Sequence, residues 1–321
     1  MRAVLARAYG GPEVLRCERV AAPAPGPHEV LIASEVATVN FADVKARRGD
    51  GTAPLPWIPG HDVVGRVEAV GEQVEGIAVG ERVGALVWSG AYAERVAADA
   101  ALVVQVPDAV ASEQAAGLVS MATAWNALTL AGRIAPGDAV LVHAAGGGVG
   151  SVAVQLAREL GARVVVGAVR SPQKADAVER AGAVALVTGY GDEHAAAARR
   201  LAGGPLDLVV DLVGGAAVVA GLAALGTFGR FVSIGNVSGQ DAQPSVVALQ
   251  QASQSLVGFR GRAYQRERAD LVAAAAAHAL ALLAEGRLEV AVAGRFALEE
   301  AAAAHAAIER GERAGKLLLV P

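Results

Sequence analysis

Cysteine is almost absent from this sequence. Its 321 residues include only Cys17, so the chain has no pair for an internal disulfide and no four-cysteine zinc site. An excess of positive charge is also lacking, because the formal net charge is −4 and the isoelectric point is about 5.9. We therefore expect no basic surface that would hold nucleic acid or an anionic membrane.

Long apolar runs are lacking as well. No uninterrupted stretch of about 18 apolar residues predicts a membrane span, and the opening MRAVLARAYGG lacks the apolar core of a signal peptide. We expect a cytoplasmic protein. The sequence does have 54% hydrophobic and 19% charged residues, which is typical of a compact globular protein. Its length suits two domains.

The pattern of apolar residues changes along the chain. Residues 1–110 contain short β-branched runs punctuated by Gly and Pro, which predict a β-rich, barrel-like domain. Over 112–132 the period becomes helical, with Ser112 as the predicted N-cap and Gly132 as the predicted C-cap. Residues 265–321 predict two helical stretches and a final strand that packs back on the first domain.

Between about 136 and 260, strands and helices alternate. The runs that read as strands are AVLVHA, RVVVGAV, VALV, LDLVVDLV and RFVSIG, with SLVGFRG as one more. Most are continuously apolar, as in a parallel sheet that is buried on both faces. The alternation predicts an α/β fold with a Rossmann-type, doubly wound parallel sheet.

The stretch VLVHAAGGGVG at 140–150 ends a strand in glycines, and helical spacing resumes directly afterwards. It carries the dinucleotide-binding fingerprint with Ala145 in its first place, then Gly147 and Gly150. A side chain at Gly147 would push a pyrophosphate away, and one at Gly150 would push the helix off the sheet. A tight turn alone is the alternative, but the strand before and the helix after favour a dinucleotide. The predicted loop contacts are Ala145, Gly146, Gly147, Gly148, Val149 and Gly150.

The next strand indicates which dinucleotide is bound. NAD enzymes place an acid at its end to accept the ribose hydroxyls, but here RVVVGAV runs into RSPQK. Arg170, Ser171 and Lys174 supply two cations and a hydroxyl, which suit a 2′-phosphate. An ordinary helix start with solvated basic residues is the alternative. We predict NADPH.

Longer stretches resemble the medium-chain dehydrogenase/reductase superfamily. They are PGHDVVGRVEAVGEQVEGIAVGERVGA, GAYAERVA, MATAWNAL and APGDAVLVHAAGGGVGSVAVQLARELGARVV. VNFADVKARRG resembles the zinc-free quinone oxidoreductase branch, the zeta-crystallin-like proteins. The resemblance implies a GroES-like catalytic domain at 1–115 that is completed by 262–321, and a Rossmann domain at 116–261. It also implies a homodimer paired through QSLVGFR.

The resemblance further implies residue roles. Asn40 and Asp43 match the segment that lines the nicotinamide, and Thr123 matches a threonine that contacts it. Lys174 and Tyr190 resemble contacts on the side of the 2′-phosphate and the adenine. The other implied cofactor contacts are Ile234, Gly235, Val237, Phe259 and Lys316.

No metal site is expected. Zinc dehydrogenases of the superfamily use Cys, His and Cys as catalytic ligands, whereas here Asn40 stands in place of the first cysteine. His61 matches the histidine, Asp62 follows it, and the second cysteine is missing, so two of the three ligands are gone. We expect His61 in a cleft wall or a hydrogen-bonded core, and we take Asn40 and His61 as the catalytic candidates.

Without a metal Lewis acid, a quinone or enone is an easier substrate than a simple ketone, because the added charge is delocalised. We predict an NADPH-dependent oxidoreductase that reduces quinones or α,β-unsaturated carbonyls. His61 and Tyr264 are candidate proton donors, and Tyr92 reads as structural. Trp57 and Trp88 line either an apolar pocket for a flat substrate or the core.

Two alternatives stay open. The first is a trans-acting enoyl reductase on acyl thioesters, whose acyl-carrier protein would meet a basic patch of Lys45, Arg47 and Arg48. The second is a non-catalytic NADPH-binding or structural protein. Turnover of any quinone or enone would discriminate between these classes.

Overall fold

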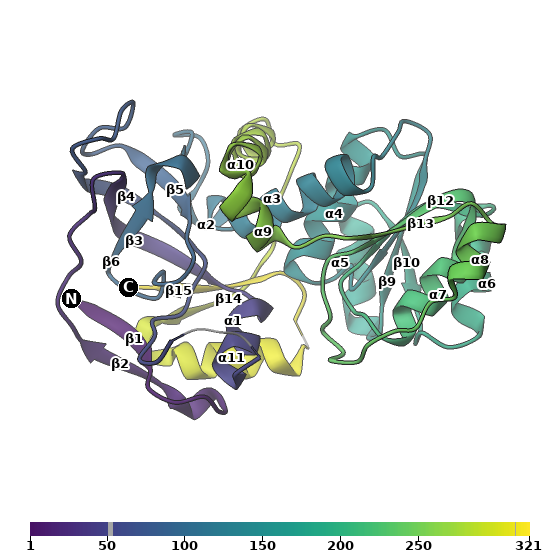
Figure 1. Ribbon diagram of the computed structural model, residues 1–321, viewed down its shortest axis with the longest axis horizontal. Coiled ribbons are helices and arrows are strands. Elements are labelled where there is room, and N and C mark those ends of the chain that lie inside the picture. Colours follow the sequence, from purple (N-terminus) through teal and green to yellow (C-terminus); the bar gives the residue numbers. More distant parts are fainter. Residues whose placement is uncertain (51–53, 312) are drawn as a thin grey trace. The chain divides into compact units, whose positions relative to one another are not determined.

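The computed structural model describes residues 1–50, 54–311 and 313–321. Its contacts divide the chain into two compact units (Figure 1). The β-rich unit comprises Met1–Ala122 and Gln265–Pro321, and the other unit comprises Thr123–Tyr264. In the described residues, no helix is both long enough and apolar enough to pass through a bilayer.

The second unit is built on a parallel sheet that has six strands among the described residues. In spatial order they are β10 (Val184–Val187), β9 (Val164–Val169), β8 (Ala139–His143), β11 (Leu206–Asp211), β12 (Leu225–Ser233) and β13 (Ser255–Gly258). Counted along the chain from β8, this is the order 3-2-1-4-5-6 of a Rossmann sheet. The strands that follow β8 in the chain, β9 and β10, lie on one side of it, and β11, β12 and β13 lie on the other. The order thus reverses between β8 and β11, and ligands of such sheets bind at that point.

Helices cover both faces of this sheet. They are α4 (Gly148–Glu159), α5 (Ala175–Arg180), α6 (Glu193–Ala202), α7 (Ala216–Ala224) and α8 (Val246–Gln251). Helices α6 and α7 contact each other over a core that includes Leu141, Val209 and Phe231. Because side chains alternate along a strand, Val140 and Val142 face the other side, where α4 packs. Both sets are fully buried, which is why these strands read as continuous apolar runs.

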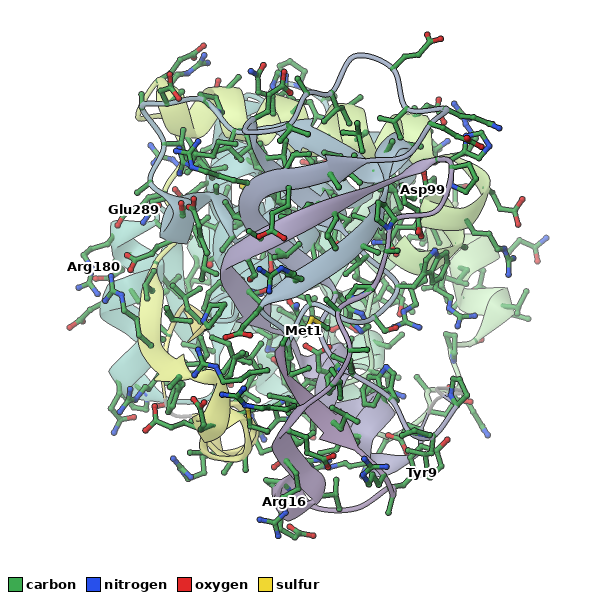
Figure 2. All side chains as sticks on the ribbon, turned by 90° about the vertical axis from the view of Figure 1, so that its left-hand side faces the viewer. Met1, Tyr9, Arg16, Asp99, Arg180 and Glu289 are labelled. Carbon is green, nitrogen blue, oxygen red and sulfur yellow. The ribbon has the colours of Figure 1, made fainter. Side chains whose placement is uncertain are left out.

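The β-rich unit has a seven-stranded sheet and a separate two-stranded sheet in the part of the chain that is described. The pair is β1 (Arg2–Ala6) and β2 (Leu15–Arg19); the larger sheet holds β14 (Val292–Ala297), β15 (Lys316–Val320), β3 (Glu29–Val39), β4 (Asp62–Val70), β5 (Arg82–Leu86) and β7 (Val103–Gln105), with β6 (Arg95–Asp99) on β3. Figure 2 looks at this unit, with Arg16 on β2 and Asp99 at the end of β6.

The C-terminal strand completes the larger sheet. β15 pairs antiparallel with β3 and parallel with β14, so Leu317 lies opposite Val39. The predicted return of the tail to the first domain is therefore confirmed. The helices that lie wholly in this unit, among the described residues, are α1 (Phe41–Arg48), α2 (Ser112–Ala115), α10 (Ala269–Ala284) and α11 (Ala301–Arg310), whereas α3 (Leu118–Asn126) and α9 (Gly261–Glu267) each include residues of both units.

The fold class predicted from the sequence, a Rossmann-type sheet plus a β-rich unit, is confirmed. The single helix predicted over 112–132 is wrong in detail, because the chain forms α2, α3 and a π-helical turn at Ala127–Ala131 instead. Ser112 is not the N-cap, since Ala111 holds that position and the Ser112 hydroxyl donates to Glu35 at 2.5 Å. Gly132 is the C-cap, as predicted.

Candidate functional site

The glycine loop follows the strand that lies at the reversal of the sheet. Gly147 is the N-cap of α4. A Cβ added at Gly150 would lie 2.9 Å from the carbonyl carbon of Ala144 and from the Cα of Ala145, which real Cβ atoms do not approach so closely. A Cβ at Gly147 would meet only the Ala144 carbonyl oxygen, at 3.3 Å. Gly150 thus lets α4 approach the loop, whereas Gly147 leaves open space at the start of the helix, where backbone N–H groups bind anions.

Two cations lie at the end of β9, beside this loop. The stem of Lys174 packs on Gly146, because a Cβ there would lie 3.0 Å from the Lys174 Cδ. Burial lowers the pKa of Lys174, and the positive charge of Arg170 lowers it further. Neither cation makes a hydrogen bond or ion pair with another of the described residues, while the Ser171 hydroxyl donates to Gln173. Two neighbouring cations without a carboxylate form a site that favours an anion.

The other predicted cofactor contacts of this unit follow the same edge. Because all six strands are parallel, the segments after them leave from one side of the sheet. These segments hold Ala145 to Gly150 after β8, Arg170, Ser171 and Lys174 after β9, Tyr190 after β10, Ile234, Gly235 and Val237 after β12, and Phe259 after β13. Thr123 on α3 faces Gly261, since a Cβ there would lie 3.4 Å from its hydroxyl. The Phe259 ring stacks on Tyr264 with centroids 4.8 Å apart.

A buried polar cluster under the glycine loop was not predicted from the sequence. His143, the last residue of β8, lies with Nδ1 2.8 Å from Oδ1 of Asp211 and with Nε2 3.1 Å from Nε2 of His194. The Tyr190 ring packs edge-on against His143 at 5.0 Å. Asp211 also accepts from the backbone N–H of Gly214 at 2.9 Å, so the cluster connects the loops that follow β8 and β11.

Burial sets the protonation of this cluster. It lowers the pKa of His194 to about 4, so that ring is neutral at pH 7. Burial, followed by the negative charge of Asp211, raises the pKa of Tyr190 to about 12. The sequence signal was a polar residue at the end of two apolar strands: His143 ends β8 and Asp211 ends β11. These two parallel strands are neighbours in the sheet, so their last residues lie side by side.

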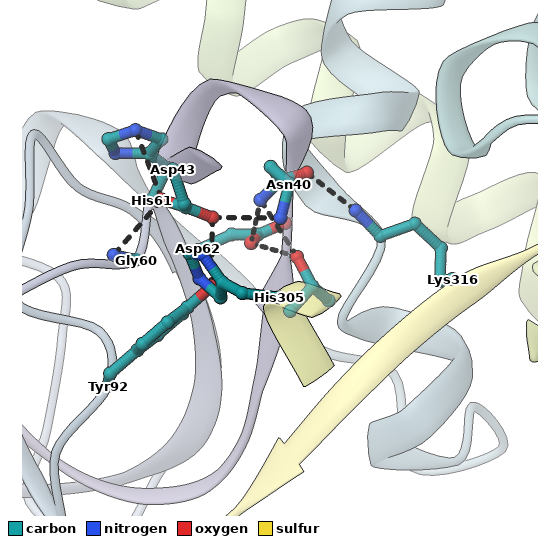
Figure 3. A network of polar contacts seen from close by, with 9 residues as sticks. Asn40, Asp43, Gly60, His61, Asp62, Tyr92, His305 and Lys316 are labelled. Atoms are coloured by element: carbon teal, nitrogen blue, oxygen red, sulfur yellow. Dashed lines mark hydrogen bonds and ion pairs between the residues drawn. The ribbon is translucent and has the colours of Figure 1, made fainter. Parts of the chain in front are cut away.

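In the β-rich unit, Asp43 is the centre of a second buried network (Figure 3). Asn40 caps α1 and Asp43 stands three residues later, which forms a capping box. The Asp43 carboxylate accepts from the backbone N–H of Asn40 at 2.8 Å, from that of Gly60 at 3.1 Å and from the Tyr92 hydroxyl at 3.1 Å. Nε2 of His61 lies 3.3 Å from its Oδ1. The carboxylate therefore has a partner on each side and orients the His61 ring.

The Asn40 side chain joins two buried charges. Its Oδ1 accepts from the Lys316 ammonium at 2.6 Å, and its Nδ2 donates to Oδ1 of Asp62 at 3.1 Å and to Thr38 at 3.1 Å. Asp62 also accepts from the Thr38 hydroxyl and from the backbone N–H of Val119. Figure 3 shows Asn40 between Lys316 and Asp62. Burial lowers the pKa of Lys316 and raises that of Asp62.

Behind Tyr92, the network reaches α11. The Tyr92 hydroxyl lies 3.2 Å from Nε2 of His305, whose Nδ1 is 3.5 Å from an Arg47 nitrogen. Arg47 in turn donates to Glu309 at 2.5 Å. Burial lowers the pKa of His305 to about 4 and, together with the charge of Asp43, raises that of Tyr92 well above its ordinary value.

The prediction of a basic patch at Lys45, Arg47 and Arg48 is corrected here, because the network buries Arg47. Arg47 is only 1% exposed and is paired with Glu309, so it is no part of a surface that a carrier protein could meet. Arg48 pairs with the same carboxylate at 2.6 Å. Trp57 lies in the hydrophobic core and Trp88 is exposed.

The candidate residues of this unit come together as one group. Asn40, Asp43, His61 and Lys316 are all buried within the network around Asp43. Within the described ranges, no three His, Cys, Asp or Glu side chains gather in a way that could hold a metal ion. The sequence did not predict that Tyr92 and His305 belong to the same network.

Two families of known proteins match two parts of this chain. The family model described as an alcohol dehydrogenase GroES-like domain matches residues 26–108, and that of a zinc-binding dehydrogenase matches residues 181–319. The GroES-like part of the fold prediction is thereby confirmed. A polyketide synthase subunit for phenolphthiocerol and phthiocerol from Mycobacterium tuberculosis is 32% identical over 96% of this chain, which spans 14% of that subunit.

Whole-length relatives are more specific. A quinone oxidoreductase from Pseudomonas aeruginosa is 33% identical and covers 98% of each chain. The structure of the Escherichia coli quinone oxidoreductase complexed with NADPH is 30% identical, covers 100% of each chain and superposes with a TM-score of 0.92. Together with the glycine loop and the capped Asn40 segment, these matches show that the chain belongs to the medium-chain dehydrogenase/reductase superfamily, in its quinone oxidoreductase branch.

Proposed function

We propose that this protein is an NADPH-dependent oxidoreductase that reduces quinones or α,β-unsaturated carbonyls. The observation that carries the proposal is the pair Arg170 and Lys174, which lies beside the glycine loop with no anionic partner among the described residues. A 2′-phosphate supplies the missing charge, and the ribose of NADH does not. The E. coli relative whose structure contains NADPH supports the same coenzyme.

The residues that would hold the coenzyme fit its shape. The open space at Gly147 and the start of α4 suit the pyrophosphate. We assign to the same site the loop from Ala145 to Gly150, Arg170, Ser171, Lys174, Tyr190, Thr123, Ile234, Gly235, Val237 and Phe259. When bound, the coenzyme supplies the hydride, and the protein supplies orientation and electrostatics.

At the reacting end we propose Asn40, Asp43, His61 and Lys316. Lys316 and Asp62 hold the Asn40 amide from opposite sides, and Asp43 holds His61 by Nε2. Groups whose rotamers are fixed in this way need no reorganisation when charge develops on a substrate oxygen. We assign Asn40 and His61 to the catalytic group on this basis.

The decisive experiment is a titration followed by a turnover screen. Coenzyme fluorescence should give a Kd for NADPH at least about 30-fold below that for NADH, since one to two charge-assisted bonds are worth about 2–4 kcal/mol. NADPH oxidation is then followed with quinones, enones and enoyl thioesters. A preference for NADH, or no turnover of any acceptor, would overturn the proposal, and the latter result with tight NADPH binding would favour a non-catalytic protein.

An enoyl reductase is the second candidate. The support is the match to the mycobacterial polyketide synthase subunit. The burial of Arg47 removes the basic patch that would have recognised an acyl-carrier protein. We therefore expect free thioesters and their carrier-bound forms to react at rates within about threefold of each other, on the order expected for surface charges that contribute little.

We propose that catalysis needs no metal. Of the three ligands of a catalytic zinc, Asn40 replaces one, and Nε2 of His61 faces Asp43. Dialysis against a chelator should leave turnover unchanged, with a zinc alcohol dehydrogenase as the positive control. A loss that added zinc restores would contradict the assignment.

We also propose a homodimer. β13 is the last strand of its sheet in the described residues and pairs only with β12. Large apolar side chains are exposed nearby: Phe228 (73%), Val246 (76%) and Val247 (60%). Light scattering after gel filtration should give twice the 32.2 kDa of the chain, and Leu256→Lys, which places a charge on the edge strand, should reduce it to one. A wild-type monomer at micromolar concentration would refute this assignment.

A further inference from the structure

Lys316 is a buried cation whose hydrogen bonds are incomplete. It is only 4% exposed, and its ammonium makes one hydrogen bond to the described residues, to Oδ1 of Asn40 at 2.6 Å. An ammonium carries three N–H donors. Two of them therefore have no protein acceptor in an interior where an unsatisfied charged donor is costly.

None of the charged groups around Lys316 accepts a hydrogen bond from its two remaining N–H groups, among the described residues. The carboxylates that act on it are Asp62 of β4 and Asp43 of α1. The Asn40 amide stands between the ammonium and Asp62, and Asp43 is occupied by its own donors. The buried Arg47 is different, because it bonds directly to a carboxylate. A buried lysine that only stabilised the fold would be expected to pair as Arg47 does.

We propose that Lys316 is the acid that donates a proton to the oxygen of the reduced substrate. This proposal rests on the proposed function, which puts Asn40 and its neighbours at the reacting end of the site. Transfer of a hydride to a quinone or enone leaves a hydroquinone monoanion or an enolate, with one negative charge on oxygen. A Lys316 N–H bond breaks, an O–H bond forms on that oxygen, and the neutral amine regains a proton from water. An enol formed in this way then gives the ketone by tautomerisation.

The other titratable groups of the network are less suited to this step. The Tyr92 hydroxyl already donates to Asp43, and its pKa is raised well above the ordinary value. His305 lies between Tyr92 and Arg47 and is neutral at pH 7. His61 is held at Nε2 by Asp43. Burial lowers the pKa of Lys316, which makes its ammonium a stronger acid, and two of its protons are not committed to the protein.

Replacement of Lys316 should separate chemistry from coenzyme binding. In Lys316→Ala and Lys316→Met we expect kcat to fall by about 10²–10⁴-fold, as for the loss of a positioned acid, with the Kd of NADPH changed less than threefold. Lys316→Arg should stay as slow as Lys316→Met, because a guanidinium does not release its proton. Arg7→Ala removes an exposed cation of the same unit, paired with Glu18, and should keep wild-type kcat.

Added amines give a readout that a structural or coenzyme-binding role would not move. Ammonium and small alkylamines should restore kcat of Lys316→Ala in a saturable manner, at rates that follow the acidity of the amine, and should leave Arg7→Ala unchanged. Wild-type kcat should fall at alkaline pH along a limb below the ordinary lysine pKa of 10.5, and Lys316→Arg should lack this limb.

The outcomes discriminate between the two proposals. A wild-type protein that neither binds NADPH nor turns over an acceptor refutes the proposed function, whatever Lys316 does. Wild-type turnover together with an unchanged kcat in Lys316→Met, or with a large rise in the Kd of NADPH as the only effect, overturns the role of Lys316. Should Lys316→Ala fail to fold, Lys316→Met and Lys316→Arg decide by kcat and by the alkaline limb.

Discussion

Gly147 and Gly150 stand one helical turn apart, yet the structure gives them different roles that mutation can separate. We predict that Gly147→Ala folds like the wild type and loses about 30–1000-fold in NADPH affinity. At Gly147 the new methyl would meet one protein atom, the Ala144 oxygen at 3.3 Å, and would otherwise point into open space. That space is where the proposed pyrophosphate lies, so the methyl displaces the ligand.

The magnitudes follow from the same geometry. Gly147 has φ −88° and ψ 174°, which any residue adopts. Alanine is the poorer N-cap by up to about 1 kcal/mol, but it also restricts the unfolded chain, which stabilises by about 0.4–1 kcal/mol. The two effects nearly cancel, and Tm should stay within about 4 °C of the wild type. Loss of one or two charge-assisted hydrogen bonds to phosphate costs about 2–4 kcal/mol, which is about 30–1000-fold in Kd.

Gly150→Ala should behave in the opposite way. Its methyl would lie 2.9 Å from two backbone atoms, of Ala144 and Ala145, so α4 must move before it fits. Overpacking of this kind costs about 1–3 kcal/mol, which lowers Tm by about 2–12 °C in a domain of this size. Gly191→Ala is the control, since a Cβ there meets nothing within 4 Å.

Two measurements on each purified variant test the argument: a thermal melt followed by circular dichroism without ligand, and a fluorescence titration with NADPH. If Gly147→Ala binds NADPH within threefold of the wild type, the pyrophosphate does not lie against this loop. If Gly150→Ala melts at the wild-type temperature, the packing of α4 on the loop is not as described.

Three further predictions test other parts of the structure. Arg170→Gln and Lys174→Gln should each weaken NADPH about 10–100-fold by titration and leave NADH unchanged, with Arg180→Gln, outside the pair, as the control. Tyr92→Phe should lower the free energy of unfolding by about 1–3 kcal/mol in urea, because a buried carboxylate and a buried imidazole each lose a partner; an unchanged midpoint would contradict the network. His305 has a folded pKa of about 4 against 6.5 for a free histidine, so the unfolded state binds more protons between these values. This residue therefore lowers stability by about 1.4 kcal/mol per pH unit as the pH drops through that window, and His194, with the same pKa, adds a similar effect. His305→Gln should make the slope less steep by its own share in denaturant titrations at pH 7, 6 and 5, and an equally steep variant would refute the assignment.

The nucleotide-binding unit could be predicted in large part because its signals are local. An apolar run, a glycine loop and a helical period follow one another within about 20 residues at 139–159, and each reports one element. The cations Arg170 and Lys174, which follow β9, were recognisable because NAD enzymes place an acid at the end of this strand and here it is missing. Short-range patterns of this kind need no knowledge of the tertiary fold.

The polar network of the β-rich unit could not be found in this way. Asp43, Tyr92 and His305 are joined by hydrogen bonds that span 49 and 213 positions of the sequence. Each of them looks ordinary in its own segment, and Tyr92 read as a structural residue. Arg47 shows the same limit, because a run of basic residues at a helix end is typical of a solvated surface, whereas its guanidinium is buried against Glu309. Only the pairing of β15 with β3 brings the end of the chain to Asn40.

The position of Asn40 explains why an amide, and no other side chain, suits the end of β3. It accepts from a buried cation, Lys316, and donates to a buried carboxylate, Asp62, so it needs one acceptor and one donor on the same rigid plane. An aspartate would place an oxygen 3.1 Å from Oδ1 of Asp62, with a repulsion on the order of 5 kcal/mol at an effective dielectric constant of about 20. A serine or alanine would leave the Lys316 ammonium without its hydrogen-bond acceptor and would remove one of the donors to Asp62. Asparagine keeps the opposite charges of Lys316 and Asp62 apart, and it is this separation that leaves the Lys316 ammonium with protons to give.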